Sequence, residues 1–128
     1  MYHKPKNNGF TLIEVLVALS ILGIALVSTV KVFGSSAKNM IHLKKHQIAY
    51  WVGSNYLIQQ QIDRTWPELG KIYSKTKMAN KEWFLTAETL QSSADKNLRE
   101  ITVKVFNKRN DKDEVVTMTG YKSREIKW

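Results

Sequence analysis

The sequence predicts an α+β fold in which one long N-terminal helix packs against a small antiparallel sheet. Apolar residues in the first half recur at three- and four-residue steps, and no proline interrupts them between Pro5 and Pro67. Proline and glycine then mark a loop over residues 63–70. Four alternating apolar and polar runs follow, as in strands with one buried face. A chain of 128 residues has room for one core, so helix and sheet are expected to share it.

The chain opens with a short polar segment, residues 1–9, and continues with an apolar stretch, residues 10–30, whose single charge is Glu14. A helix of 21 residues rises about 32 Å, enough to cross a hydrocarbon core of about 30 Å. A lone carboxylate in hydrocarbon costs about 3 kcal/mol or more unless a cation or a proton neutralises it. Glu14 is therefore expected to need a partner.

Three kinds of targeting segment are compatible with this pattern. The first is an uncleaved signal anchor, and the second is a conventional secretory signal cut after Ala37, where Gly-Ser-Ser-Ala supplies small residues. A conventional signal has an apolar region of about 7–15 residues and no use for an acid near its start. Glu14 therefore favours the third kind, a leader cut before the apolar stretch.

Residues 9–19, Gly-Phe-Thr-Leu-Ile-Glu-Val-Leu-Val-Ala-Leu, resemble the class III signal of type IV pilins and type II secretion pseudopilins. The resemblance implies that a prepilin peptidase cuts between Gly9 and Phe10 and methylates the new amino group of Phe10. Removing the 9 leader residues from 128 leaves a mature chain of 119 residues. The resemblance also implies that Glu14 neutralises the terminal amine of a neighbouring subunit. Loss of either group would leave the other charge buried.

The helix is predicted to run from Phe10 to about Gln61 or Arg64, with a lipid-facing part followed by a stem. An apolar stripe on a helix usually packs in the protein's own core, so Trp51 and Val52 are expected to face the sheet. The spacing leaves open which stripe residues face the sheet and which face a partner subunit. The candidate residues for packing or partner contacts are Ile41, Ile48, Trp51, Val52, Asn55 and Ile58.

The strands are predicted over residues 71–78, 82–90, 98–107 and 114–122. The clearest alternation places Ile101, Val103 and Val105 on one face. Residues 79–81 and 109–113 have the composition of hairpin turns.

Several short patches narrow the resemblance to the I-type minor pseudopilin of type II secretion. They are Ala-Tyr-Trp-Val at 49–52, Trp-Pro at 66–67, Glu-Trp at 82–83, Asn-Leu-Arg at 97–99 and Ile-Thr-Val-Lys-Val at 101–105. The resemblance implies a pilin-like fold and an assembly subunit. This subunit joins J-type and K-type minor pseudopilins in a tip complex, with H-type and major G-type subunits below. The complex helps to initiate and cap the periplasmic pseudopilus. Residues 106–128 add nothing to the resemblance.

The implied organisation has three parts: a leader over residues 1–9, a transmembrane half over residues 10–30 and a periplasmic α+β domain over residues 31–128. The lysines that follow the apolar stretch outnumber those before it, so charge counting alone would favour the orientation opposite to the one that the resemblance implies. The bacterial inner membrane and the periplasmic side are thus implied by the resemblance. A minor pilin of a type IV pilus and a periplasmic binding module with a conventional signal remain alternatives.

Other function classes find little support in the residues. The net charge of +9 comes from scattered lysines without a nucleic-acid motif, and the absence of cysteine removes disulfides and thiolate ligands. Ser35, Ser36, Ser92 and Ser93 have no neighbouring base that would mark a nucleophile, and neither an enzyme nor a cofactor is expected. His42 and His46 lie four residues apart without a third ligand. Asp111, Asp113 and Glu114 lack the spacing of a calcium loop and suit a hairpin turn, with a calcium site left open.

Overall fold

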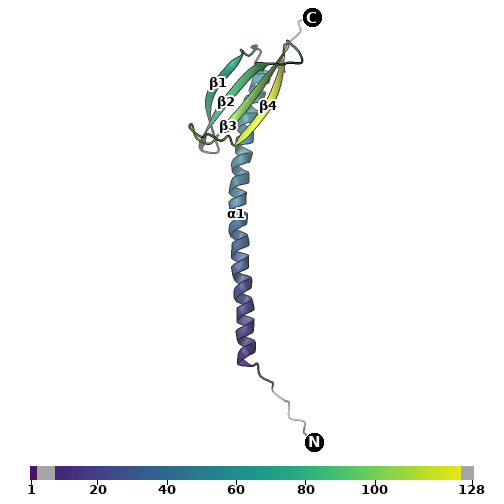
Figure 1. The fold of residues 1–128 in the computed structure, drawn as a ribbon, viewed down its shortest axis with the longest axis vertical. Helices are drawn as coiled ribbons and strands as arrows, with labels where there is room; N and C mark the ends of the chain where they lie inside the picture. The colour runs from purple at the N-terminus through teal and green to yellow at the C-terminus, as the bar shows by residue number, and fades with distance from the viewer. Residues whose placement is uncertain (3–7, 125–128) are drawn as a thin grey trace. The chain divides into compact units, whose positions relative to one another are not determined.

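The computed structural model describes residues 1–2 and 8–124, and the chain divides into two compact units, Met1–Met40 and Ile41–Trp128. One helix comes first and four strands follow (Figure 1). These elements are α1 (Leu12–Ile62), β1 (Gly70–Met78), β2 (Lys81–Gln91), β3 (Leu98–Phe106) and β4 (Val116–Ser123). The predicted α+β class, with one long helix and a small antiparallel sheet, is confirmed.

Helix α1 begins at Leu12 because Thr11, just before it, and Glu14, in its first turn, form a capping box. The Glu14 carboxylate accepts the backbone N–H of Thr11 at 2.9 Å, and the Glu14 N–H donates to the Thr11 hydroxyl at 3.3 Å. The Thr11 hydroxyl also lies 3.2 Å from the same carboxylate oxygen. The predicted start at Phe10 is two residues early, because a threonine followed three residues later by a glutamate fixes the first helical turn.

The sheet has the order β1-β2-β3-β4 with every neighbouring pair antiparallel. Ala79 and Asn80 have φ of 51° and 59°, which makes a two-residue turn of type I′ between β1 and β2. Lys81, expected in that turn, already pairs with Met78. Strand β4 begins two residues later than predicted, because residues before it form a turn in which the Asp111 carboxylate accepts the Lys108 N–H at 2.9 Å.

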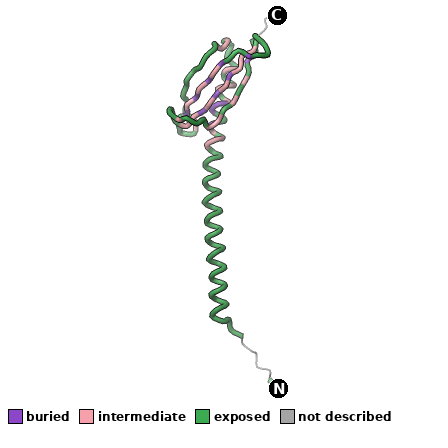
Figure 2. Tube along the Cα trace, viewed as in Figure 1, coloured by how far each residue is buried: buried purple, intermediate pink, exposed green. Residues whose placement is uncertain are grey.

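The core of the second unit lies between one face of the sheet and the C-terminal part of α1, which runs behind the strands in Figure 1. In Figure 2 the buried positions are confined to this unit. The predicted alternation in the third strand is confirmed, since its apolar residues are buried on the helix-facing side. The buried apolar residues are Ala49, Val52, Trp83, Leu85, Ala87, Ile101, Val103 and Val105.

Small residues let the helix approach the sheet closely at two points. A Cβ at Gly53 would lie 2.9 Å from the Met118 sulfur and 3.2 Å from a methyl of Val105. A Cβ at Gly120 would lie 3.0 Å from a methyl of Leu57. Gly53 therefore marks a close contact between α1 and strands β3 and β4.

Replacing Gly53 by valine is expected to lower the free energy of unfolding of the second unit by about 1–3 kcal/mol, because the added methyl groups overfill the core. The measurement is thermal unfolding of the full-length chain in detergent, followed by near-ultraviolet circular dichroism. Gly34→Val is the matched control, since a Cβ there meets open space. Equal unfolding midpoints for the two variants would contradict the close approach at Gly53.

The C-terminal end of α1 is held by a lysine from the last strand. Lys122 is 7% exposed and its Nζ donates to the carbonyls of Gln60 at 2.6 Å, Thr65 at 2.8 Å and Asp63. A cation bonded to the last carbonyls of a helix satisfies acceptors that the helix leaves open and opposes the negative end of its dipole. The neighbouring Asp63 carboxylate accepts a hydrogen bond from the Thr65 backbone N–H, and this bond is the main reason that the pKa of Asp63 is lowered. Lys122 thus joins β4 to the helix end.

Candidate functional site

The N-terminal part of α1 is an exposed apolar rod. It contains an 18-residue window with mean hydropathy 2.4, and none of that window is buried. In Figure 2 this part of the helix is exposed along its whole length. Its length and composition are sufficient to cross a membrane. A helix with apolar side chains on every side has no single face for a protein core, as expected of a segment surrounded by lipid.

The hydroxyl side chains inside the apolar stretch form hydrogen bonds to the backbone of the same helix. The hydroxyls of Ser20, Ser28 and Thr29 each donate to the carbonyl four residues earlier, at 2.8 Å. These bonds remove the cost of placing unpaired hydroxyl donors in hydrocarbon. Among the acidic and basic residues of the described chain, only Glu14 lies within residues 10–30.

Gly9 and Phe10 lie just before the capping box, outside the helix, and both are exposed. Exposed segments outside helices and strands are the preferred sites of proteolytic cleavage. The Glu14 carboxylate accepts a hydrogen bond from the backbone N–H of Thr11, the residue after Phe10. Glu14 also lines a shallow hollow together with Ile13, Val17, Ala18 and Ile21. The predicted cleavage point and the predicted charge-neutralising acid are thus neighbours at the start of α1.

The stem residues separate into two groups in the second unit. Val52 is 2% exposed and packs in the core as expected, and Ile48 is half-buried against it. Trp51 is 52% exposed, so the expectation that it faces the sheet is wrong. The reason is helical geometry, because one step along the helix turns a side chain by about 100° away from its neighbour. Ile41, Asn55 and Ile58 are exposed as well.

The sheet-facing side of the stem also includes Ala49, Gly53, Tyr56 and Leu57, which were not singled out as candidates. Ala49 and Gly53 lie four residues apart, and small residues at that spacing are the signal that could have found this face. Burial raises the pKa of the Tyr56 hydroxyl.

A line of apolar side chains remains uncovered on the other side of the stem. Trp51, Ile58 and Ile62 are spaced by seven and four residues, which places them along one face of a helix. They are 52%, 52% and 68% exposed. We call these three residues the stem face. Asn55 lies between Trp51 and Ile58 on this face. Several large exposed apolar side chains on one helix face are typical of a surface that binds another protein.

The candidate metal ligands have other contacts. The rings of His42 and His46 lie 4.4 Å apart at 58°. Asp111 closes its own turn, and Glu114 lies 3.8 Å from the Lys104 ammonium, with its pKa lowered mainly by its own backbone N–H. Within residues 1–2 and 8–124, no group of three metal-binding side chains comes together.

A long apolar N-terminal helix with an acid in its first turn, a stem that carries a four-stranded antiparallel sheet and an uncovered apolar stem face define a pilin-like subunit. The chain matches the family "Type II secretion system (T2SS), protein I" over residues 43–123 and the "Prokaryotic N-terminal methylation motif" over residues 4–30. The chain belongs to the first of these families and is therefore a minor pseudopilin of type II secretion.

Similar proteins cover nearly the whole chain. A type II secretion system protein I of Pseudomonas aeruginosa is 31% identical over 80% of this chain and 79% of the relative. Relatives with the same name from Aeromonas hydrophila and Klebsiella michiganensis are 28% and 26% identical over 91% of this chain, and 97% and 95% of the relatives. The family consists of structural pseudopilins and is not a known enzyme family. Its apolar N-terminal helix points to anchoring in the inner membrane.

Proposed function

We propose that this pseudopilin joins J-type and K-type minor pseudopilins in a tip complex that initiates and caps the periplasmic pseudopilus, with H-type and major G-type subunits below. The observation that carries this proposal is the stem face, where Trp51, Ile58 and Ile62 are left uncovered beside a core that is already filled. The helix of a second subunit, laid along this line, would bury the three side chains.

We propose that processing precedes assembly. Prepilin peptidase removes residues 1–9 by cutting between Gly9 and Phe10, and the amino group of Phe10 is methylated. The match to the N-terminal methylation motif and the exposed backbone before the capping box support this step. Residues 10–30 then hold the chain in the inner membrane lipid, and residues 31–128 lie in the periplasm until the subunit is incorporated into the pseudopilus.

Glu14 is proposed to meet the methylated amine of a neighbouring subunit once both chains are processed. Its carboxylate accepts the backbone N–H of Thr11, the second residue after the proposed cleavage point, so the side chain reaches back toward the start of the helix. Bringing an amine to it would cancel both charges in a medium of low dielectric constant.

The stem face predicts a large effect of a charge at Trp51. We expect Trp51→Glu to weaken association with a J-type subunit by about thirtyfold or more, because a central aromatic contact contributes about 2 kcal/mol or more. Secretion should fall in parallel. The measurements are co-purification of the full-length pair from membranes and the fraction of exoprotein released.

The matched control is Tyr50→Glu, because Tyr50 is 54% exposed but lies off the line of the stem face. This variant is expected to keep both association and secretion. Equal losses for the two variants, or normal association of Trp51→Glu with the J-type subunit, would show that the stem face is not the partner surface.

A further inference from the structure

Strand β1 presents a long, regular and uncovered edge of the sheet. It pairs with β2 through nine consecutive residue pairs without a bulge, and eight of its nine residues are exposed. In the part of the chain that the structure describes, its outer side has no neighbouring strand. An edge of this kind can accept a further strand through backbone hydrogen bonds.

The geometry of the hairpin determines which groups are available on that edge. In a hairpin with a two-residue turn, the residues that flank the turn form a hydrogen-bonded pair, and bonded and non-bonded pairs alternate from there. Met78 and Lys81 flank the turn. The backbone N–H and C=O groups of Lys77, Lys75, Tyr73 and Lys71 therefore point away from β2.

The opposite edge of the sheet differs, because the helix occupies part of it. The side-chain amide of Gln61 donates to the Tyr121 carbonyl, and Lys122 is buried against the end of α1. Strand addition at β4 would have to displace these contacts. The free edge for a partner strand is thus β1.

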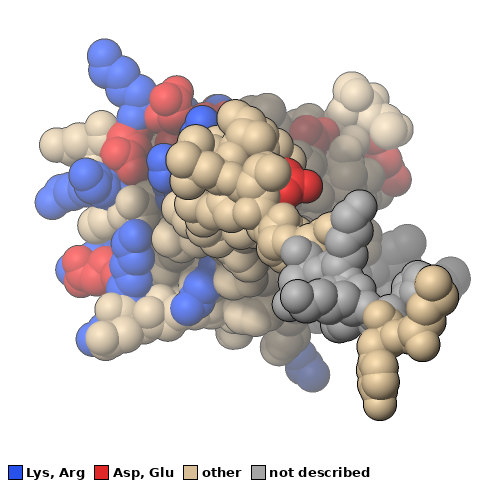
Figure 3. Space-filling view, turned by 90° about the horizontal axis from the view of Figure 1, so that it is seen from below, with Lys and Arg blue, Asp and Glu red and all other residues tan. Residues whose placement is uncertain are grey.

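The charges on β1 select the partner. Lys71, Lys75 and Lys77 share one face of the strand, the face turned away from the helix. In an antiparallel pair of two copies centred on Ser74, Lys71 would face Lys77, and like charges placed opposite each other destabilise a sheet. A second copy of this chain is therefore disfavoured. Carboxylates at the same positions are favoured on the open side of β1, while Glu88 and Glu82 of β2 lie opposite Lys71 and Lys77 on the other side. Seen from below, the side where Figure 1 shows β1 carries Lys and Arg side chains, with Asp and Glu side chains among them (Figure 3).

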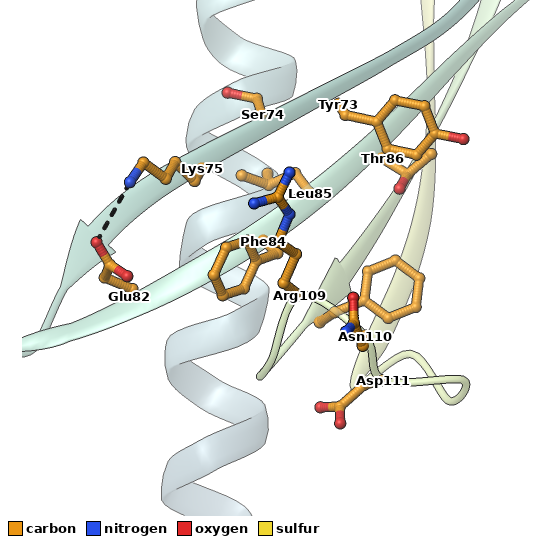
Figure 4. A pocket seen from close by; sticks show the side chains of 11 residues that line it. Tyr73, Ser74, Lys75, Glu82, Phe84, Leu85, Thr86, Arg109, Asn110 and Asp111 are labelled. Carbon is orange, nitrogen blue, oxygen red and sulfur yellow. Dashed lines mark ion pairs between the residues drawn. The ribbon is translucent and has the colours of Figure 1, made fainter.

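A cleft of about 800 Å³ lies next to this edge on the same face. Phe84 and Phe106, a cross-strand pair on β2 and β3, contribute its aromatic wall, and Arg109 extends toward Phe84 from the segment after β3 (Figure 4). Tyr73 and Lys75 line it on the side of β1. Lys75 lies 3.6 Å from Glu82, and beyond that ion pair the lining contains one further cation, Arg109, and one further acid, Asp111.

The other face of β1 carries one large exposed apolar side chain, Ile72, beside Ser74 at the centre of the strand. Ile72 points to the helix side of the sheet, is 55% exposed and pairs with the buried Ala87. A strand added to β1 would extend the core over Ile72 with one face and meet the lysines with the other. The matching sequence alternates apolar and acidic residues.

We propose that the β1 edge and the adjoining cleft bind an extended acidic segment of another protein, which adds to the sheet as a fifth strand. Its carboxylates lie against Lys71, Lys75 and Lys77, its apolar residues cover Ile72, and a side chain beside Tyr73 enters the cleft. This inference concerns the sheet and does not depend on the stem face.

The test uses the full-length chain in detergent micelles and two synthetic peptides, one with alternating glutamate and valine and one with alternating lysine and valine. We expect the acidic peptide to bind at least about tenfold more tightly, because three opposite-charge pairs contribute about 0.2–1 kcal/mol each. Added salt should weaken it. Amide resonances should shift at Lys71, Tyr73, Lys75 and Lys77.

The triple variant Lys71→Glu, Lys75→Glu, Lys77→Glu should reverse the preference, and a control triple with the same charge change at Lys38, Lys44 and Lys96 should keep it.

A second pair of variants tests strand addition apart from charge. Tyr73→Pro removes an outward N–H without affecting the bonds to β2, and should abolish binding, whereas Tyr73→Ala keeps the N–H and should retain it. The proposal is overturned by equal binding of the two peptides, by no binding of the acidic one, by shifts confined to β4 or the stem, or by undiminished binding to Tyr73→Pro.

Discussion

Replacing Lys122 by methionine should lower the free energy of unfolding of the second unit by about 3 kcal/mol or more. The Lys122 ammonium donates to three backbone carbonyls, of Gln60, Asp63 and Thr65, at the end of α1. Methionine has a similar length but no donor, so these acceptors lose a charged partner at a site that is largely closed to water. Each hydrogen bond to a charged group is worth about 1.5–3 kcal/mol, and water can replace part of the loss.

Urea unfolding of the full-length chain in detergent, followed by near-ultraviolet circular dichroism, measures this effect. Lys112→Met is the matched control, because Lys112 is exposed in the connection between β3 and β4 and its loss should change stability by less than about 0.5 kcal/mol. In hydrogen exchange, the amides of the last turn of α1 should lose protection in Lys122→Met. A variant as stable as the control would mean that the lysine does not hold the helix end.

Replacing Glu14 by glutamine should abolish incorporation into the pseudopilus and reduce exoprotein secretion by more than about a hundredfold. Glutamine at the third helical position still completes a capping box with Thr11, so the start of α1 is preserved and only the charge is lost. A terminal amine left without its carboxylate in a buried site costs about 3–5 kcal/mol, which corresponds to at least about a hundredfold in an assembly equilibrium.

Thr11→Ala is the complementary variant, because it removes the hydroxyl of the capping box and keeps the carboxylate. It should weaken the helix start by about 1 kcal/mol and retain most secretion. Intact mass should show that all chains begin at methylated Phe10, so that loss of secretion reflects assembly and not processing. Normal secretion by Glu14→Gln, or an equal loss in Thr11→Ala, would contradict charge neutralisation. A mature chain that begins at Lys38 would mean a conventional signal peptide.

Most of the fold could be predicted because its elements are defined by local patterns. The period of the apolar residues locates α1 and the alternation in residues 101–105 locates β3, and both are confirmed. Proline and glycine in the loop of residues 63–70 mark the helix end. The predicted boundaries are least accurate where a hydrogen bond between a side chain and the backbone sets the end of an element. Examples are the bond between Glu14 and Thr11 at the helix start and the bond between Asp111 and Lys108 before β4.

The candidate site could be predicted only in part. Glu14 and the apolar stretch are visible in the sequence because a charge in a long apolar run stands out whatever surrounds it. The stem is harder, because Trp51 and Val52 are adjacent and equally apolar, yet Val52 lies in the core and Trp51 is exposed. Their difference in burial depends on which side of the helix the sheet covers. The apolar stripe of the stem includes residues on both the covered and the exposed side, so the sequence pattern does not distinguish them.

The sequence by itself therefore determined the class of the fold, the membrane-compatible helix, the family and the acid at the helix start. These depend on neighbours within a few residues, for which period and composition are sufficient. The tertiary structure alone decided that Gly53 meets Met118 and that Lys122 holds a helix end about sixty residues earlier in the chain. It also decided that no strand among residues 1–2 and 8–124 pairs with the outer edge of β1. The physical reason is that burial and pairing at these positions are set by contacts between distant segments, which no local pattern records.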